Sequence, residues 1–159
     1  MSKRLVTVKV CALGETRSGY AVFLGDGEKA FLMLIDQDVG TAIALALQGT
    51  APVRPLTHDL VLTVLRAFGA RVERVILDDL KDDTYFARLV LSAENELQQK
   101  TRFELDVRPS DGIALAVRQG APICVRGELW DRVEDVSEAL RKLQEQGPQA
   151  EGGDEDEAP

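Results

Sequence analysis

Residues 36–60 read DQDVGTAIALALQGTAPVRPLTHDL, and the rest of the chain is organised around this stretch. Its first half is apolar and rich in alanine, which predicts a helix that ends at Gly49. A loop with two prolines follows, since Pro52 and Pro55 exclude regular structure there. The stretch then ends in a polar cluster at residues 54–59, which contains His58, the only histidine of the chain. We therefore expect a buried helix, a loop, and a polar corner that opens the next helix.

A partial copy of this pattern occurs further along the chain. The segment GIALAVRQGAP at 112–122 resembles AIALALQGTAP at 42–52. The copy follows its own polar run, Arg108-Pro109-Ser110-Asp111. The chain thus holds two Arg-Pro clusters, and each is expected to open a helix.

The charge of the chain is unevenly distributed. The formal net charge is −8, but six of the 27 acidic residues lie after Gln144, where no Lys or Arg occurs. The rest of the chain holds 21 acidic and 19 basic residues and is nearly balanced. This composition argues against a generally basic nucleic-acid binder but leaves room for a local patch. We predict one globular domain over residues 1–145 and a disordered acidic tail over 146–159.

The sequence indicates a cytoplasmic protein. The apolar run after Lys3 and Arg4 is broken early, so no signal peptide is expected. No segment reaches the ~18 apolar residues of a membrane span, which predicts no membrane partner. Cys11 and Cys124 both fall in expected strands, where buried reduced thiols are the more frequent outcome. A disulfide between them would instead imply an oxidising compartment.

Apolar periodicity and turn residues predict an α+β fold with a mixed or mainly antiparallel sheet and about four helices. The order of the elements is roughly βββααβββαβα. Expected strands cover 5–12, 20–24, 29–35, 71–79, 84–91, 101–107 and 122–125. Expected helices run from Asp36 or Asp38 to 48, from 57 to 68, from 110 to 119 and from 128 to 144.

The two polar clusters have a purely structural explanation. Thr57 and Ser110 are natural N-caps, and Asp59 and Asp111 lie in the first turns, where acidic side chains complement the helix dipole. The arginines would then pair with acids nearby.

A functional explanation adds His58. An imidazole beside an aspartate can act as a general base or a metal ligand. Asp59 and Asp111, with Asp106 as a further candidate, could hold a divalent cation such as Mg²⁺ or Mn²⁺. Arg54 and Arg108 could bind a phosphate in bidentate fashion. These parts suit phosphodiester hydrolysis, although their spacing matches no general catalytic motif.

Three strings, AIALALQG, RPLTHDL and DVRPSDGIALAVRQGAPI, occur in this order over the globular part of the chain. In sequence and spacing they closely resemble the bifunctional nuclease domain family, formerly a domain of unknown function. The resemblance covers about residues 5–126. It implies a compact α+β fold that tends to form homodimers and an activity on both RNA and DNA. Its residues here are Arg54, Thr57, His58, Asp59, Arg108, Ser110 and Asp111.

One departure from the family pattern affects the expected site. The pattern resembles IGxxEAxAIALAL, and Val39 stands where it has the glutamate. Asp36 or Asp38 could supply a carboxylate instead. Two functions are therefore weighed. The first is a nuclease with His58, Asp59 and Asp111 as catalytic or metal-binding residues. The alternative is a non-catalytic binding or regulatory module that uses the two Arg-Pro clusters as a ligand or partner site.

Overall fold

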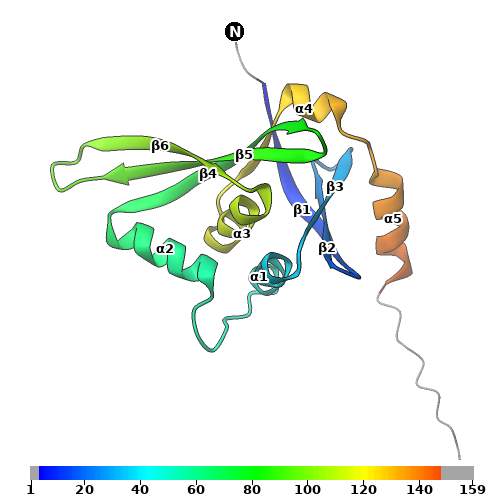
Figure 1. The fold of residues 1–159 in the computed structure, drawn as a ribbon, viewed down its shortest axis with the longest axis horizontal. Coiled ribbons are helices and arrows are strands. Elements are labelled where there is room, and N and C mark those ends of the chain that lie inside the picture. Colours follow the sequence, from blue (N-terminus) through cyan, green and yellow to red (C-terminus); the bar gives the residue numbers. More distant parts are fainter. Residues whose placement is uncertain (1–3, 148–159) are drawn as a thin grey trace, which may run out of the picture.

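The computed structural model describes residues 4–147 and confirms an α+β fold with one seven-stranded mixed sheet (Figure 1). The strands lie in the order β3-β2-β1-β7-β4-β5-β6. The elements, in chain order, are β1 (Leu5–Thr16), β2 (Gly19–Gly25), β3 (Ala30–Asp36), α1 (Gln37–Leu47), α2 (Thr57–Ala67), β4 (Ala70–Lys81), β5 (Thr84–Glu94), β6 (Lys100–Val107), α3 (Pro109–Gln119), β7 (Ile123–Arg126), α4 (Gly127–Arg132) and α5 (Ser137–Gln146). The acidic tail after residue 147 lies outside the described residues.

Two antiparallel meanders form the two halves of the sheet. Strands β1, β2 and β3 make one half, and β4, β5 and β6 make the other. Strand β7 joins them, because it pairs antiparallel with β1 and parallel with β4. The helix α3 provides the crossover that a parallel neighbour requires.

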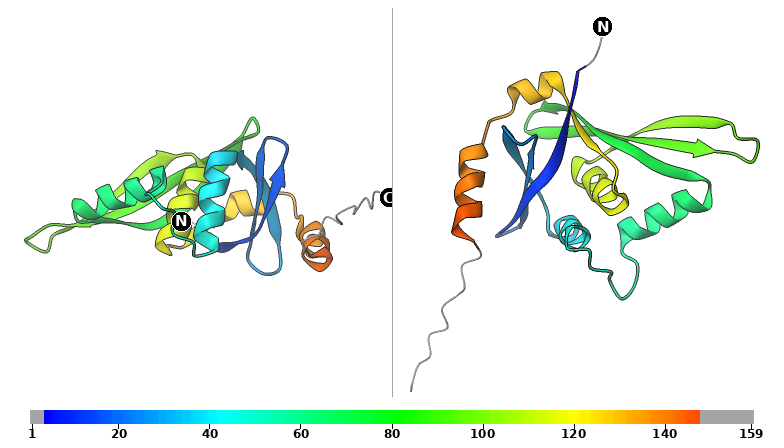
Figure 2. Two further views of the ribbon diagram at one scale, coloured as in Figure 1. Left: turned by 90° about the horizontal axis from the view of Figure 1, so that it is seen from below. Right: turned by 180° about the vertical axis from the view of Figure 1, so that it is seen from behind.

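The main core lies between the sheet and the helices α1, α2 and α3. Along β2 and β3, alternate residues such as Leu24, Phe31 and Met33 enter this core. Their neighbours Phe23 and Ala30 form a second, smaller cluster with Leu140 of α5. Helix α5 therefore covers the opposite face of this half of the sheet, where Figure 2 shows it apart from α1 and α3. Side chains of a strand alternate between the two faces of a sheet, so apolar residues at successive positions of β2 and β3 make both faces apolar.

The last helix differs from the sequence-based expectation. A single helix over 128–144 was predicted, but the structure has α4 and α5 with an extended break after Arg132. At the break, Val136 donates its backbone N–H to the carbonyl of Ala30 at 2.7 Å, and Asp135 accepts the N–H of Ser137 at 2.9 Å. Pairing with the start of β3 thus replaces helical hydrogen bonds that periodicity alone would favour.

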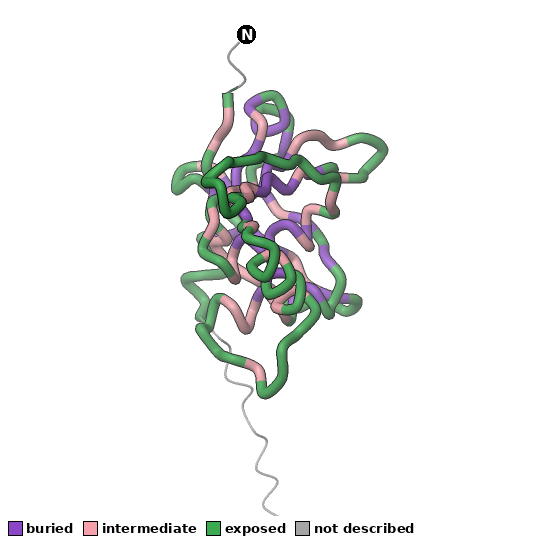
Figure 3. The backbone as a smooth tube through the Cα atoms, turned by 90° about the vertical axis from the view of Figure 1, so that its left-hand side faces the viewer, coloured by how far each residue is buried: buried purple, intermediate pink, exposed green. Residues whose placement is uncertain are grey.

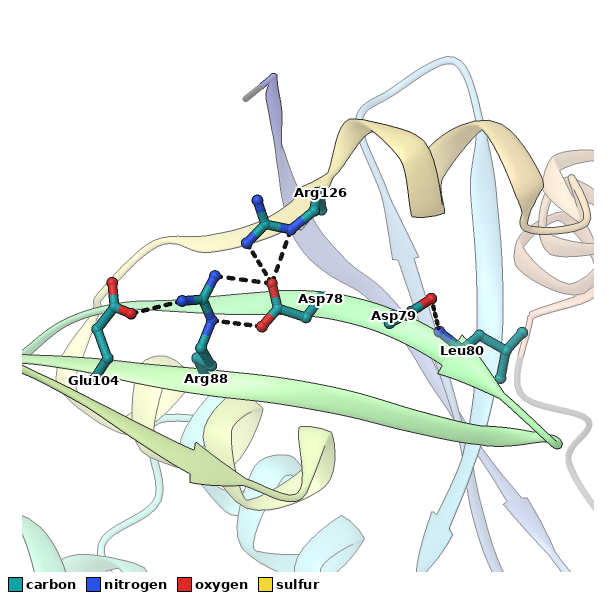
Figure 4. A network of polar contacts seen from close by, with 6 residues as sticks. All are labelled: Asp78, Asp79, Leu80, Arg88, Glu104 and Arg126. Carbon is teal, nitrogen blue, oxygen red and sulfur yellow. Dashed lines mark hydrogen bonds and ion pairs between the residues drawn. The ribbon is translucent and has the colours of Figure 1, made fainter. Parts of the chain in front are cut away.

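A partly buried ion network ties the second half of the sheet to β7 (Figure 4). The carboxylate of Asp78 on β4 accepts hydrogen bonds from Arg126 on β7, at 2.9 Å from Nε, and from Arg88 on β5, at 3.1 Å from Nη2. Arg88 also reaches Glu104 on β6 at 2.6 Å. Burial alone would raise the pKa of Asp78, but the two guanidinium groups outweigh it and hold that pKa below its ordinary value. Two carboxylates and two guanidinium groups therefore link four strands.

The structure also bears on membrane spans and on the two cysteines. Within residues 4–147, no helix is long and apolar enough to cross a bilayer. Cys11 and Cys124 are both free thiols; Cys124 is buried beside Ile76 and Val90, as expected, whereas Cys11 is only partly buried.

Close packing of α1 on β2 generates a test of this fold. A Cβ atom at Gly40 would lie 2.1 Å from Cδ2 of Tyr20. Alanine is the better helix former by roughly 0.5–1 kcal/mol, but such a clash costs about 1–3 kcal/mol. We expect Gly40→Ala to lower the free energy of unfolding in a denaturant titration. Gly14→Ala is the control, because nothing lies within 4 Å of its Cβ position. An unchanged or more stable Gly40→Ala protein would contradict this packing.

Candidate functional site

The two Arg-Pro clusters open α2 and α3, but the N-cap of each helix lies earlier in the sequence than expected. The N-cap positions are Leu56 for α2 and Arg108 for α3, so the caps predicted at Thr57 and Ser110 lie one and two residues too late. At α2, the carboxylate of Asp59 reaches back and accepts the N–H of Leu56 at 3.0 Å. At α3, Pro109 occupies the first helical position, which suits proline because it lacks an N–H. Ser110 lies inside this helix and is 8% exposed.

The fold brings three distant segments together around Asp111. His58 Nε2 lies 3.0 Å from Oδ1 of Asp111, and Arg108 Nε donates to Oδ2 of Asp111 at 2.7 Å. Arg108 also donates from Nη1 to Oδ2 of Asp36 at 3.1 Å. Asp36 ends β3, His58 opens α2, and the other two open α3. We call these four residues the His58 cluster.

Electrostatics in this cluster favour an ionised Asp111. Burial alone would raise its pKa, but hydrogen bonds from Arg108 and His58 outweigh that effect and lower the pKa. The hydrogen bond to Asp111 likewise raises the pKa of Arg108, which stays cationic. The His58 side chain is only 15% exposed, whereas the Arg108 side chain is 60% exposed and accessible to a ligand. The cluster therefore presents an oriented imidazole beside a fixed positive charge.

The imidazole geometry allows proton transfer. When Nε2 donates its hydrogen to the Asp111 carboxylate, Nδ1 keeps a lone pair that can accept a proton. The carboxylate also stabilises the imidazolium that forms after such a transfer. The arrangement can thus work as a general base whose ring orientation is set by Asp111.

The remaining predicted site residues lie elsewhere. Asp59, although next to His58 in sequence, pairs with Arg118 of α3, with 2.6 Å between its Oδ1 and the guanidinium Nε. Arg54 is exposed in the loop between α1 and α2, and Figure 3 shows that most of this loop is exposed. Within residues 4–147, Arg54 makes no ion pair. The structure therefore brings His58, Arg108 and Asp111 together and turns Asp59 toward a different partner.

Val39 is 5% exposed and packs in the main core. Of the two carboxylates that could replace the missing glutamate, Asp36 is the one that reaches the His58 cluster. Sequence reasoning did not single out Arg118. Its spacing of seven residues from Asp111 on one helix, two turns along the same face, was the available signal.

The carboxylates do not fit the predicted metal site. Among residues 4–147, no three His, Cys, Asp or Glu side chains are grouped closely enough to hold an ion. Asp59 and Asp111 are each paired with a different arginine, and a cation on either carboxylate would meet that guanidinium charge. This geometry does not support a shared Mg²⁺ or Mn²⁺ site on Asp59 and Asp111.

Comparison with known proteins agrees with the resemblance in the sequence. Residues 22–138 match the bifunctional nuclease domain, and this range contains the whole His58 cluster. An uncharacterized protein of Mycobacterium tuberculosis strain H37Rv is 36% identical over 100 residues, which is 63% of this chain and 56% of that protein. Bifunctional nuclease 1 of Oryza sativa subsp. indica is 28% identical over 120 residues, which is 74% of this chain and 36% of that protein.

The matched region thus spans about half of the mycobacterial relative and about a third of the rice relative. The family match itself extends over most of the described residues, from β2 to the start of α5. The chain therefore belongs to the bifunctional nuclease domain family.

Proposed function

We propose that this chain is a cytoplasmic nuclease that hydrolyses phosphodiester bonds in RNA and DNA at the His58 cluster. The observation that carries the proposal is the 3.0 Å contact between His58 and Asp111, with the exposed guanidinium of Arg108 on the same carboxylate. The name of the rice relative supports the reaction class. The free thiols of Cys11 and Cys124 are consistent with a reducing compartment.

In this proposal His58 is the general base. Its Nδ1 takes a proton from a water molecule, whose oxygen attacks the phosphorus. As the new P–O bond forms, the bond to the leaving oxygen breaks, and that oxygen takes a proton from solvent. Arg108 stabilises the charge that develops on the phosphoryl oxygens, and Arg54 binds a neighbouring phosphate. Asp111 is a positioning residue that holds the imidazole. Asp59 acts through its ion pair with Arg118, which fixes the start of α2 against α3.

The sharpest test of this role is His58→Ala. Removal of a general base lowers the rate by roughly 10²–10⁴-fold, so cleavage of labelled single-stranded RNA and DNA should fall by at least that lower factor. The two proteins, purified identically, are compared with Mg²⁺, with Mn²⁺ and with EDTA, which also tests the predicted metal requirement. Equal cleavage by both proteins would remove His58 from the mechanism.

The lowered pKa of Asp111 predicts a specific pH dependence of stability. Because this pKa is lower in the folded state than the unfolded value of about 3.9, the carboxylate stabilises the fold above that pH. The contribution is lost as the pH falls through the folded-state pKa. Asp111→Asn should therefore lower the free energy of unfolding at pH 7 by about 1 kcal/mol, since the side chain is partly exposed.

This difference between the wild-type and Asp111→Asn proteins should shrink below about pH 4. Denaturant titrations from pH 3 to pH 7 measure it. Asp106→Asn is the control, because Asp106 is exposed on β6. A difference that stays constant down to pH 3 would contradict the ionised Asp111 in the cluster.

The alternative is a binding or regulatory module without catalysis. It is favoured by one observation: Arg108 is already engaged by two carboxylates, Asp36 and Asp111, as in a structural corner. Val39 in the core and the net charge of −8 agree with it. Folded wild-type protein that cleaves neither RNA nor DNA under all three conditions would favour this alternative.

We further propose that the chain forms a homodimer through the face that carries α2 and β6. Strand β6 is an edge of the sheet, and Phe103 and Leu105 on it are exposed, as are Val64 on α2 and Phe68 directly after it. Exposed apolar side chains beside an unpaired edge favour association.

Light scattering should give twice the 17.4 kDa of one chain, and Phe68→Asp should give the monomer mass. Phe68 is 82% exposed, so the substitution leaves the core intact. Leu143→Asp on the exposed side of α5 is the control. Wild-type protein that scatters as a monomer would refute the dimer.

A further inference from the structure

A second cationic feature lies between α2, the end of α3 and the loop that precedes α2. The loop between α1 and α2, one side of α2 and the end of α3 line a groove of about 570 Å³. Its size falls within the ~300–1,000 Å³ of small-ligand sites. Its charged lining residues are Asp59, Arg66 and Arg118, and we call it the Arg66 groove.

The charges in this groove leave one guanidinium available. Arg118 is held by Asp59 at 2.6 Å, and its side chain is 28% exposed. Arg66, in the last turn of α2, is exposed and forms no ion pair within residues 4–147. The lining thus carries two guanidinium groups against one carboxylate. This excess favours an anionic ligand, even though the chain as a whole is acidic.

The loop residues that line the groove are apolar. Pro52 and Pro55 restrict the loop backbone, and Val53 between them is 99% exposed. A flat aromatic group can lie against such a surface without ordering a long flexible side chain. The groove therefore combines a cationic end with an apolar wall, which matches the two parts of a nucleotide.

The groove lies next to a smaller recess beside His58. Pro52, Asp59 and Arg118 line both the groove and a smaller recess that His58 also lines. A chain of phosphates bound at the His58 cluster could therefore continue past Asp59 toward Arg66.

We propose that the Arg66 groove binds one unpaired nucleotide of a single-stranded nucleic acid, next to the phosphodiester at the His58 cluster. Arg66 and Arg118 contact its phosphate, and Pro52 and Val53 contact its base. The base must be out of a duplex to reach this wall, so the groove selects single strands. The role as a substrate subsite rests on the proposed nuclease function, whereas nucleotide binding by the groove does not.

The test uses a ligand that contains no internucleotide bond, so that binding is measured apart from cleavage. Thymidine 3′,5′-bisphosphate is titrated into the full-length protein by calorimetry at low salt, with inorganic phosphate and thymidine as comparison ligands. Arg66→Gln removes one charge-assisted contact and should weaken binding about fivefold or more.

Val53 offers a matched pair of substitutions, because a fully exposed position does not perturb the core. Val53→Asp should weaken binding of the bisphosphate about threefold, and Val53→Lys should strengthen it by a similar factor, as expected for one charge near a phosphate. Arg141→Gln on α5 changes the net charge as Arg66→Gln does but lies outside the groove, and it should have no effect.

Several results would overturn the proposal. They are no binding by the wild-type protein, equal affinities in all variants, or inorganic phosphate binding as tightly as the bisphosphate. The nuclease proposal fails separately. If no cleavage is found but the substitutions change binding as expected, the groove is the ligand site of a binding module. If His58→Ala abolishes cleavage while the groove variants bind equally, the nuclease stands without this subsite.

Discussion

Strand β7 contributes only four residues, yet it is the only strand that pairs with both halves of the described sheet. It pairs with β1 on one side and with β4 on the other, and Ile123, Cys124 and Val125 are all buried. Burial of an isoleucine or valine side chain stabilises a fold by about 1.5–3 kcal/mol. Arg126, the last residue of β7, adds its ion pair with Asp78. Without this pairing the two meanders would share no backbone hydrogen bonds.

The position of β7 also determines where α3 lies. Because β7 runs parallel to β4, the chain must cross over the sheet, and α3 makes that crossing in close contact with the strands. A Cβ atom at Gly112 would lie 2.7 Å from Val75, which shows how closely this helix approaches β4. The same helix contacts α1 and α2. Its first turn therefore meets the start of α2 and the end of β3, where His58, Asp36 and Asp111 come together.

Carboxylate–guanidinium pairs organise both sides of α2. Asp111 and Arg108 lie on the side of His58, and Asp59 and Arg118 lie on the side of the groove. In each pair a partly buried carboxylate is compensated by an arginine, either at the N-cap of α3 or within that helix, because an unpaired buried charge would be costly. The pairs hold α2 and α3 in a fixed relation, and the exposed guanidinium of Arg108 remains accessible to an anionic ligand. The residues that support the structure are thus also the ones proposed to contact a ligand.

The sequence by itself determined the features that depend on neighbouring residues. Alternating and helical periodicity predicted all seven strands and the helices α1, α2 and α3. The two Arg-Pro clusters predicted where α2 and α3 begin and indicated the family. Local pattern did not reveal the break between α4 and α5, because that break depends on hydrogen bonds to Ala30, far away in the chain. The positions of the two helix caps were likewise missed by one or two residues.

Only the tertiary structure decided which charges meet. His58 and Asp59 are adjacent in sequence but lie with different partners, since successive side chains on a helix point about 100° apart. Asp36, rather than Asp38, reaches Arg108 because β3 ends beside the first turn of α3. Such contacts join segments more than fifty residues apart. They depend on the pairing of β7 and the packing of α3, which no local pattern in the chain specifies.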